Sequence, residues 1–273
     1  MRNVVEFPGA PDSAADSQPA PAYAELAVTT HFSFLRGASH PEELARQAAA
    51  LKLAGIGIAD RNSVAGVVQA YAAVEQLNEK IRELNAAHQA NAPTLKLIVG
   101  ARLVFADGTP DILAYPQNRS AWGRLTRLLT VGKSRGDKAE CILYLDDLIE
   151  HIAGLNLIVM PSSSAHSRES GNPGPRTGSP LSRGRAGKLE KLLSRLTAAA
   201  PRHVWLAASM LYRGDDTRRL RRLAAIAEST GVPLIAVNDV LYHAPERRPL
   251  QDVITCIREH VTIDTAGRLL EAN

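Results

Sequence analysis

The chain has 273 residues, 45% of them hydrophobic, so it can bury the core of one α/β barrel or of two smaller domains. Its 32 basic and 28 acidic residues leave a net charge of +4, which gives only weak support for a polyanionic partner. No apolar run approaches the roughly 18 residues of a membrane span, and the start has no apolar core of a secretory signal. These features exclude a wholly disordered chain and a membrane-spanning one.

The two cysteines, Cys141 and Cys256, lie far apart in the chain and form no C-x-x-C pattern. Neither a zinc site nor a disulfide framework is therefore indicated. Cysteine usage of this kind favours a reducing compartment, and we expect the protein to be cytoplasmic.

Short apolar strands alternate with amphipathic helices from Tyr23 onward, after a flexible leader rich in Pro, Ala and Ser over residues 1–22. This alternation is typical of βα units around a parallel sheet or barrel. We expect seven strands, at Ala24–Thr30, Gly55–Ala59, Leu95–Phe105, Asp111–Tyr115, Leu155–Met160, Val204–Ser209 and Val232–Val237.

Helices are predicted between most of these strands. One opens at Pro41, with Glu42 and Glu43 near the positive end of the helix dipole. Another starts at Ser63 and carries an apolar stripe whose helical spacing favours core packing over a ligand role. The stripe consists of Val64, Val67, Val68, Tyr71 and Val74. A basic helix at Arg213–Arg222 is interpreted as a solvated outer face, with DNA contact as the alternative.

The range 162–187 breaks this alternation. It is rich in Ser, Gly, Pro and Arg and has almost no large apolar residue, so it cannot repay the entropy of ordering. We predict a disordered surface insertion, because long loops cost little free energy. The alternative is that its arginines tether DNA or RNA through the phosphates.

Polar side chains gather at the predicted strand ends, where a parallel barrel presents its functional residues. They are Thr29, Thr30, His31, Asp60, Arg61, Asn62, Arg102, Asp111, Asn238, Asp239 and His243. A hydrolytic metal site needs several His and carboxylate groups that converge on the cations. This ring is too poor in such ligands and too rich in arginine for a multinuclear cluster. His31, Asp239 and His243 remain as residual candidates for a single weak metal site.

Four segments, in order, carry a resemblance to a known family. They read YAELAVTTHFSFLRGASHPEELARQAA, GIGIADRNSVAGVVQAY, LIVGARLVFADGTPDILAYP and VNDVLYHAPERRPLQDVITCIREHVTID. Together they resemble the amino-terminal polymerase-and-histidinol-phosphatase (PHP) domain of the bacterial error-prone C-family DNA polymerase, a damage-tolerance relative of the replicative polymerase III α subunit. The resemblance extends over residues 23–273, interrupted by the insertion. It implies a distorted (β/α)7 PHP-type barrel.

The resemblance also implies positions for metal ligands, and most of them hold other residue types here. The His-x-His pair that ends the first strand in metal-binding members matches Ala27 and Thr29. A later His position matches Asp111. The final Asp-x-His keeps Asp239 and places Leu241 where the histidine is expected. We therefore expect a degenerate pocket, with no catalytic residue and no metal or other cofactor.

Three further ligand positions match Arg36, Arg61 and Arg102. Arginine is permanently charged and binds carboxylates bidentately, so our hypothesis is that these side chains replace the cations and pair with three aspartates. The aspartates are Asp60, Asp111 and Asp239. Two alternatives stay open: the arginines are solvated loop residues, or they hold a phosphate or a DNA backbone.

For function, the resemblance implies translesion synthesis and damage-induced mutagenesis by the complete polymerase. That enzyme is expected to bind primed template DNA, deoxynucleotides, Mg²⁺ and the other proteins of the mutagenesis cassette. The similarity reaches Asn273, before any palm, thumb or fingers, so we expect no polymerase active site in this chain. Our interpretation is an isolated domain or a truncated gene product. We expect a structural role, packing against the polymerase body. The alternatives are a metal-dependent phosphoesterase and a free-standing module that binds DNA or a partner protein.

Overall fold

The computed structural model describes residues 22–270, apart from residues 90, 139, 162–182 and 213. Residues 1–21 of the predicted leader and residues 162–182 of the predicted insertion therefore lie outside the described residues. Helix α5 (Arg183–Ala199) covers the end of the insertion range, residues 183–187, so the loop prediction is wrong there.

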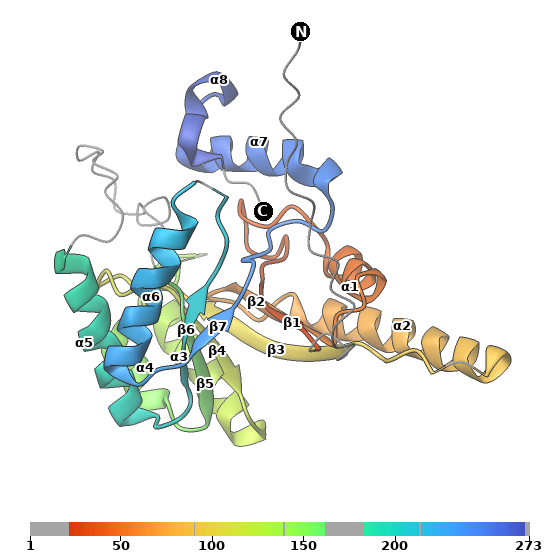
Figure 1. Cartoon of the computed structure of the whole chain (residues 1–273), viewed down its shortest axis with the longest axis horizontal. Coiled ribbons are helices and arrows are strands. Elements are labelled where there is room, and N and C mark those ends of the chain that lie inside the picture. The colour runs from red at the N-terminus through yellow and green to blue at the C-terminus, as the bar shows by residue number, and fades with distance from the viewer. Residues whose placement is uncertain (1–21, 90, 139, 162–182, 213, 271–273) are drawn as a thin grey trace, which may run out of the picture.

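One curled sheet forms the centre of the described chain, with strands in the order β1 to β7 and each hydrogen-bonded to the next (Figure 1). The strands are β1 (Ala24–Val28), β2 (Gly55–Arg61), β3 (Lys96–Leu103), β4 (Ile112–Pro116), β5 (Leu155–Val159), β6 (Val204–Ala208) and β7 (Leu234–Ala236). All seven predicted strands are confirmed, and no end is displaced by more than two residues.

The sheet is mixed, whereas the sequence pattern predicts a parallel one. Strand β4 runs antiparallel to both β3 and β5, and the other pairs are parallel. The physical reason is the connection between β3 and β4, residues 104–111, which is too short to hold the crossover helix that a parallel pair requires. The reversal matters for the site because it places the start of β4 beside the end of β3.

The backbone after β7 returns to β1 and brings the two edges of the sheet together. Thr29 N donates to Val240 O at 2.9 Å, and Val240 N donates to Ala27 O at 2.7 Å. Below this contact the buried carboxylate of Glu25 accepts hydrogen bonds from Asn238 N and Nδ2 at 2.9 and 3.0 Å. Burial raises the pKa of Glu25, although its hydrogen bonds act in the opposite direction. The result is a distorted (β/α)7 barrel.

The helices are α1 (Pro41–Ala50), α2 (Val67–His88), α3 (Arg119–Ser134), α4 (Leu145–His151), α5, α6 (Asp216–Thr230), α7 (Arg248–Glu259) and α8 (Ile263–Ala266), with 3₁₀ turns η1 (Pro245–Arg247) and η2 (Gly267–Leu269). Most helices lie around the outside of this barrel, while α7 and α8 lie beyond one end of the sheet (Figure 1). The predicted start at Pro41 is confirmed, and Glu43 accepts a hydrogen bond from His40 N at 3.0 Å. No helix among the described residues is long and apolar enough to cross a membrane.

Two helix predictions need correction. The helix expected from Ser63 begins at Val67, and the side chains of Val68 and Tyr71 are exposed instead of packed in the core. Helix α2 buries the narrower face formed by Ala70, Val74 and Asn78, because the small alanine lets it approach α1 and the sheet closely. The basic helix expected from Arg213 begins at Asp216, which supplies the acid of its first turn.

Apolar side chains fill the interior of the barrel as well as the layer under the helices. The interior cluster consists of Ala27, Ala59, Leu113, Tyr115, Ile158, Met160, Ala207 and Val237. These residues alternate along the strands with those that pack against helices, as expected for a sheet buried on both faces. The interior of the barrel is thus a packed core.

Candidate functional site: an arginine pocket at the barrel mouth

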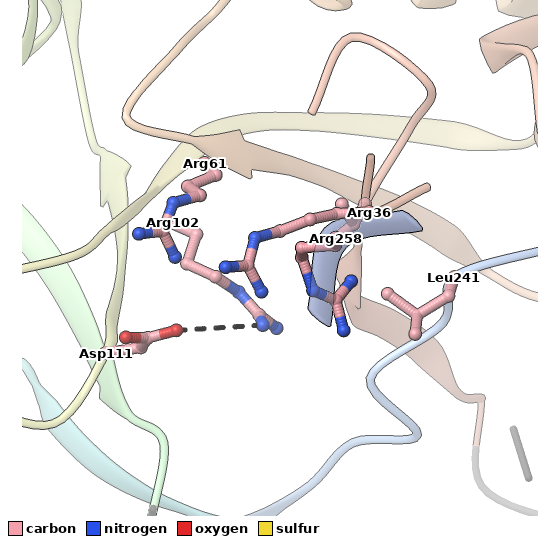
Figure 2. A pocket seen from close by; sticks show the side chains of 7 residues that line it. Arg36, Arg61, Arg102, Asp111, Leu241 and Arg258 are labelled. Atoms are coloured by element: carbon pink, nitrogen blue, oxygen red, sulfur yellow. Dashed lines mark ion pairs between the residues drawn. The ribbon is translucent and has the colours of Figure 1, made fainter. Parts of the chain in front are cut away.

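A small pocket lies at the end of the barrel where β1, β2 and β3 finish and β4 begins. It is lined by Thr29, Arg36, Arg61, Arg102, Asp111, Leu241 and Arg258. Figure 2 shows the four guanidinium groups gathered between Asp111 on one side and Leu241 on the other. The structure therefore brings together most of the positions singled out from the sequence. Ala27 lies instead in the barrel interior.

The strands place two of the arginines side by side. Arg61 ends β2 and is paired in register with Arg102 on β3. Arg36 reaches the same space from the loop after β1. Like charges on neighbouring strands repel, so an arrangement of this kind requires nearby carboxylates or another source of negative charge.

Arg102 is the buried centre of the pocket, with only 8% of its side chain exposed. It forms an ion pair with Asp239 and lies 3.9 Å from Asp111, whose carboxylate precedes β4. Burial alone would lower the pKa of Arg102, but the charges of Asp239 and Asp111 outweigh this and raise it. For Arg102, the structure agrees with carboxylate pairing and contradicts the alternative of a solvated loop residue.

Asp60 does not join this ion-pair network, contrary to our hypothesis. Its fully buried carboxylate accepts hydrogen bonds from Thr30 N at 2.9 Å, Thr30 Oγ1 at 2.9 Å and Ser33 Oγ at 2.7 Å. The reason is the position of Asp60 one residue before Arg61 on β2, which points the two side chains to opposite faces of the strand. Asp60 instead fixes the loop that carries Arg36.

Burial raises the pKa of Asp60, although its hydrogen bonds from Ser33 and Thr30 oppose the shift. A carboxyl group with a raised pKa binds its proton more tightly in the folded state. Its titration therefore adds stability below the ordinary pKa of 3.8, and this stability is lost as pH rises through the folded pKa. We expect Asp60→Asn to lower the free energy of unfolding by about 1–3 kcal/mol, because it disturbs these hydrogen bonds. The loss should be larger at acid than at neutral pH.

Urea unfolding of the wild type and Asp60→Asn from acid to neutral pH measures this difference. Asp146→Asn serves as the control, because the side chain of Asp146 is 81% exposed. If the loss of stability in Asp60→Asn grew with increasing pH, the raised pKa of Asp60 would be contradicted.

Arg258 is a pocket residue that the sequence did not single out. It lies on α7, donates from Nη1 to Leu35 O at 2.9 Å and pairs with Glu259 at 3.0 Å. The hydrogen bond to Leu35 O holds α7 against the loop after β1. The only feature of the sequence that points to Arg258 is the amphipathic pattern of α7. That pattern predicts a helix, but it does not predict that the helix packs across the barrel mouth.

Two of the residual metal candidates, His243 and Asp239, have other polar partners, whereas Nδ1 of the third, His31, has no hydrogen-bond partner among the described residues. His31 packs its ring against His40, with centroids 4.1 Å apart, while His243 Nδ1 is 2.8 Å from Ser39 Oγ. Asp239 is paired with Arg102. Throughout the part of the chain that the structure describes, no group of three or more His, Cys, Asp or Glu residues is arranged to hold a metal ion.

Comparison with known proteins agrees with this architecture. The PHP domain family matches residues 25–178, more than half of the chain, and the chain therefore belongs to the PHP domain family. Over almost its whole length it is similar to proteins named error-prone DNA polymerase. The one from Rhodopseudomonas palustris (strain BisB5) is 50% identical over 255 residues, which cover 93% of this chain and 20% of the relative. The one from Bradyrhizobium sp. (strain ORS 278) is 48% identical over 256 residues, which cover 92% of this chain and 19% of the relative.

The chain thus spans about a fifth of the length of these relatives and corresponds to their PHP-containing portion. Among solved structures, a Bifidobacterium adolescentis protein described as a metal-dependent phosphoesterase superposes with a TM-score of 0.52 at 16% identity. The superposition covers 83% of this chain and 90% of that one, and it supports the fold alone. The family and the fold inferred from the sequence are both confirmed.

The pocket residues do not suit the metal that the family resemblance implies. Guanidinium groups donate hydrogen bonds and offer no lone pair to a cation. The carboxylates of Asp111 and Asp239 remain at these positions, and both face Arg102. This donor set differs from the His and carboxylate clusters that bind catalytic cations.

Proposed function

We propose that this chain is the PHP portion of an error-prone DNA polymerase that acts in translesion synthesis and damage-induced mutagenesis in the cytoplasm. Within that enzyme the barrel has a structural role, and its pocket is a degenerate metal site. Primed DNA, deoxynucleotides and Mg²⁺ are bound by the polymerase portion, which also contacts the other mutagenesis proteins. Support comes from the curated relatives, which are about five times as long as the region they share with this chain.

The observation that carries the structural role is the buried ion pairing of Arg102. It joins β3 to Asp111, ahead of β4, and to Asp239, which lies in the segment that closes the barrel after β7. A cation bound by residues from several strands would cross-link the same segments. The guanidinium group makes this connection without an ion and leaves no position for a metal-activated water.

A second observation favours packing against a large partner. Helix α7 exposes an apolar stripe at positions i, i+3 and i+7, and the start of α8 adds a fourth apolar side chain. The residues are Leu250, Val253, Ile257 and Ile263, each 42–54% exposed. Contiguous apolar surface of this kind is typical of an interaction site. The occupant that we propose is the polymerase portion of the enzyme, which accounts for most of the length of the relatives.

Hydrolysis assays test the structural role. We expect the purified chain to release no product from a generic phosphodiester, with or without added Mn²⁺, Zn²⁺ or Mg²⁺, because the pocket lacks the ligands to hold an activated water. Metal analysis after dialysis should find no stoichiometric ion. Hydrolysis that is metal-dependent and lost in Asp239→Asn would overturn the proposal in favour of the phosphoesterase alternative.

A genetic assay tests the polymerase assignment separately. Disruption of the gene should lower the frequency of mutations induced by a DNA-damaging agent, while spontaneous mutation changes little. An unchanged induced frequency would contradict a role in damage-induced mutagenesis and leave the structural conclusions about the barrel intact.

A further inference from the structure

An aromatic side chain is exposed in the loop between β6 and α6, at the mouth end of the barrel. Tyr212 is 81% exposed, and Met210 nearby is also exposed. The backbone of Tyr212 has a φ of 52°, a left-handed conformation that is uncommon for residues other than glycine. Backbone strain of this kind persists only where the surrounding structure holds it, and it is concentrated at functional sites such as ligand clamps.

The backbone that leads to Tyr212 is fixed to the first turn of α6. Leu211 N donates to Oδ1 of the buried Asp216 at 2.9 Å, and Arg219 pairs with the same oxygen at 3.1 Å. Arg219 also donates to the carbonyl oxygen of Ser209. Because these bonds already order the chain before Tyr212, a ligand that stacks on the ring has little further backbone to immobilise.

Helix α6 places a row of arginines next to this loop. Arg218, Arg221 and Arg222 occupy its first two turns, and all three are exposed. Spacings of three and four residues put them on one face of the helix. Asp216, the acid of the first turn, is buried, and the exposed Glu228 lies in the last turn. The end of α6 nearest to Tyr212 is therefore its basic end.

Helix α5 extends this basic surface. It lies beside α6 and contacts it (Figure 1). Its exposed lysines, Lys188 and Lys191, fall in the first half of the helix. Two acids of the same region, Glu190 and Asp215, are half-buried. Among the described residues of this surface, the exposed bases of α5 and α6 thus outnumber the acids beside them.

The chemistry of this surface suits a single-stranded nucleic acid. Exposed arginines and lysines attract phosphates without regard to sequence, and an exposed aromatic ring stacks on any base. The bases of a duplex are already stacked on one another, so a duplex can use the charges but not the ring. An acidic peptide can also use the charges, but it leaves the ring without a stacking partner.

We propose that the loop between β6 and α6, together with the first turns of α6, binds single-stranded nucleic acid. One base stacks on Tyr212, and the neighbouring phosphates are held by Arg218 and Arg221. The other exposed bases of α5 and α6 attract the strand to this surface. The site gives the barrel a nucleic-acid contact of its own, and it does not depend on the function proposed above because it belongs to the described chain itself.

Fluorescence anisotropy of the purified chain at low salt tests the stacking contact, with a labelled oligo(dT) of about 20 nucleotides as the probe. Tyr212→Ala should weaken binding about tenfold, because stacking on one base is lost. Tyr212→Phe keeps the ring and should bind like the wild type. Tyr71→Ala removes another exposed tyrosine, on α2, and is the matched control. The proposal is overturned if the wild type does not bind, if Tyr212→Ala binds as tightly as the wild type, or if Tyr212→Phe loses as much affinity as Tyr212→Ala.

The salt dependence of binding tests the phosphate contacts separately. Arg218→Gln combined with Arg221→Gln should make the slope of log K against log salt shallower by about 1.4, since each contact with a single strand contributes about 0.7. Arg119→Gln combined with Arg127→Gln removes two exposed arginines from α3 and should keep the slope of the wild type. An equal change with both pairs would show attraction by net charge alone and would overturn the site. Thermal unfolding checks that every variant is folded.

Competition and crosslinking distinguish other occupants of the same surface. A duplex of the same length that binds more tightly than the single strand would overturn the single-strand assignment, and so would polyglutamate that displaces the oligonucleotide at equal charge. Photocrosslinking with bromodeoxyuridine in the oligonucleotide gives a direct measurement that does not depend on the variants. Crosslinks should include Tyr212, and crosslinks confined to other residues would contradict the proposal.

Discussion

Replacement of Arg102 by methionine is expected to destabilise the chain by about 3 kcal/mol, since removal of one member of a buried ion network leaves the other charges uncompensated. The side chains of Asp111 and Asp239 are only 22% and 29% exposed, so water can restore part but not all of their solvation. Methionine retains much of the aliphatic volume of arginine, which limits the cavity left behind. Chemical denaturation of the wild type and Arg102→Met at neutral pH gives the difference directly.

A triple variant separates charge from packing in this prediction. Arg102→Met combined with Asp111→Asn and Asp239→Asn removes all three charges, and it should recover a large part of the lost stability. Arg195→Met is the surface control: its ion pair with Asp146 is exposed, and such pairs contribute about 0–1 kcal/mol. If Arg102→Met cost no more than Arg195→Met, the central position of Arg102 in the barrel mouth would be refuted.

The strands of this barrel could be predicted because their signal is local. Apolar runs such as Leu155–Val159 are bounded by helical or polar segments, and the structure places a strand at each of the seven predicted sites. The direction of β4 depends instead on the length of a single connection. The packing face of α2 also escaped prediction, because Val68 and Tyr71 share the helical spacing of buried residues but lie beyond the reach of α1 and the sheet.

The pocket was predictable only in part, for a similar reason. The match to family ligand positions placed Arg36, Arg61 and Arg102 together, and all three line the pocket. Which carboxylate pairs with which arginine is decided by strand register and side-chain direction, and sequence reasoning therefore misassigned Asp60. Arg258 was missed because it reaches the mouth through the packing of α7, far along the chain from the first three strands.

The loop that carries Arg36 has little freedom to move, because Gly37 packs directly on the end of β1. A Cβ atom at position 37 would collide with Thr30 O and would lie 2.7 Å from Thr29 O. Both obstacles are backbone atoms, which cannot swing aside as a flexible side chain can. The loop or the strand end would have to shift, and either movement would displace Arg36 from the pocket.

We therefore expect Gly37→Ala to destabilise the chain by about 3 kcal/mol, at the upper end of the usual cost of overpacking. Gly123→Ala is a matched control with the opposite expected sign. Gly123 lies inside α3, and a Cβ atom there would meet nothing within 4 Å, so alanine should stabilise the helix by about 0.5–1 kcal/mol. Thermal and urea unfolding of both variants measure the contrast. Equal stability of Gly37→Ala and the wild type would mean that the loop is not held against β1, and that the position of Arg36 is not fixed by packing.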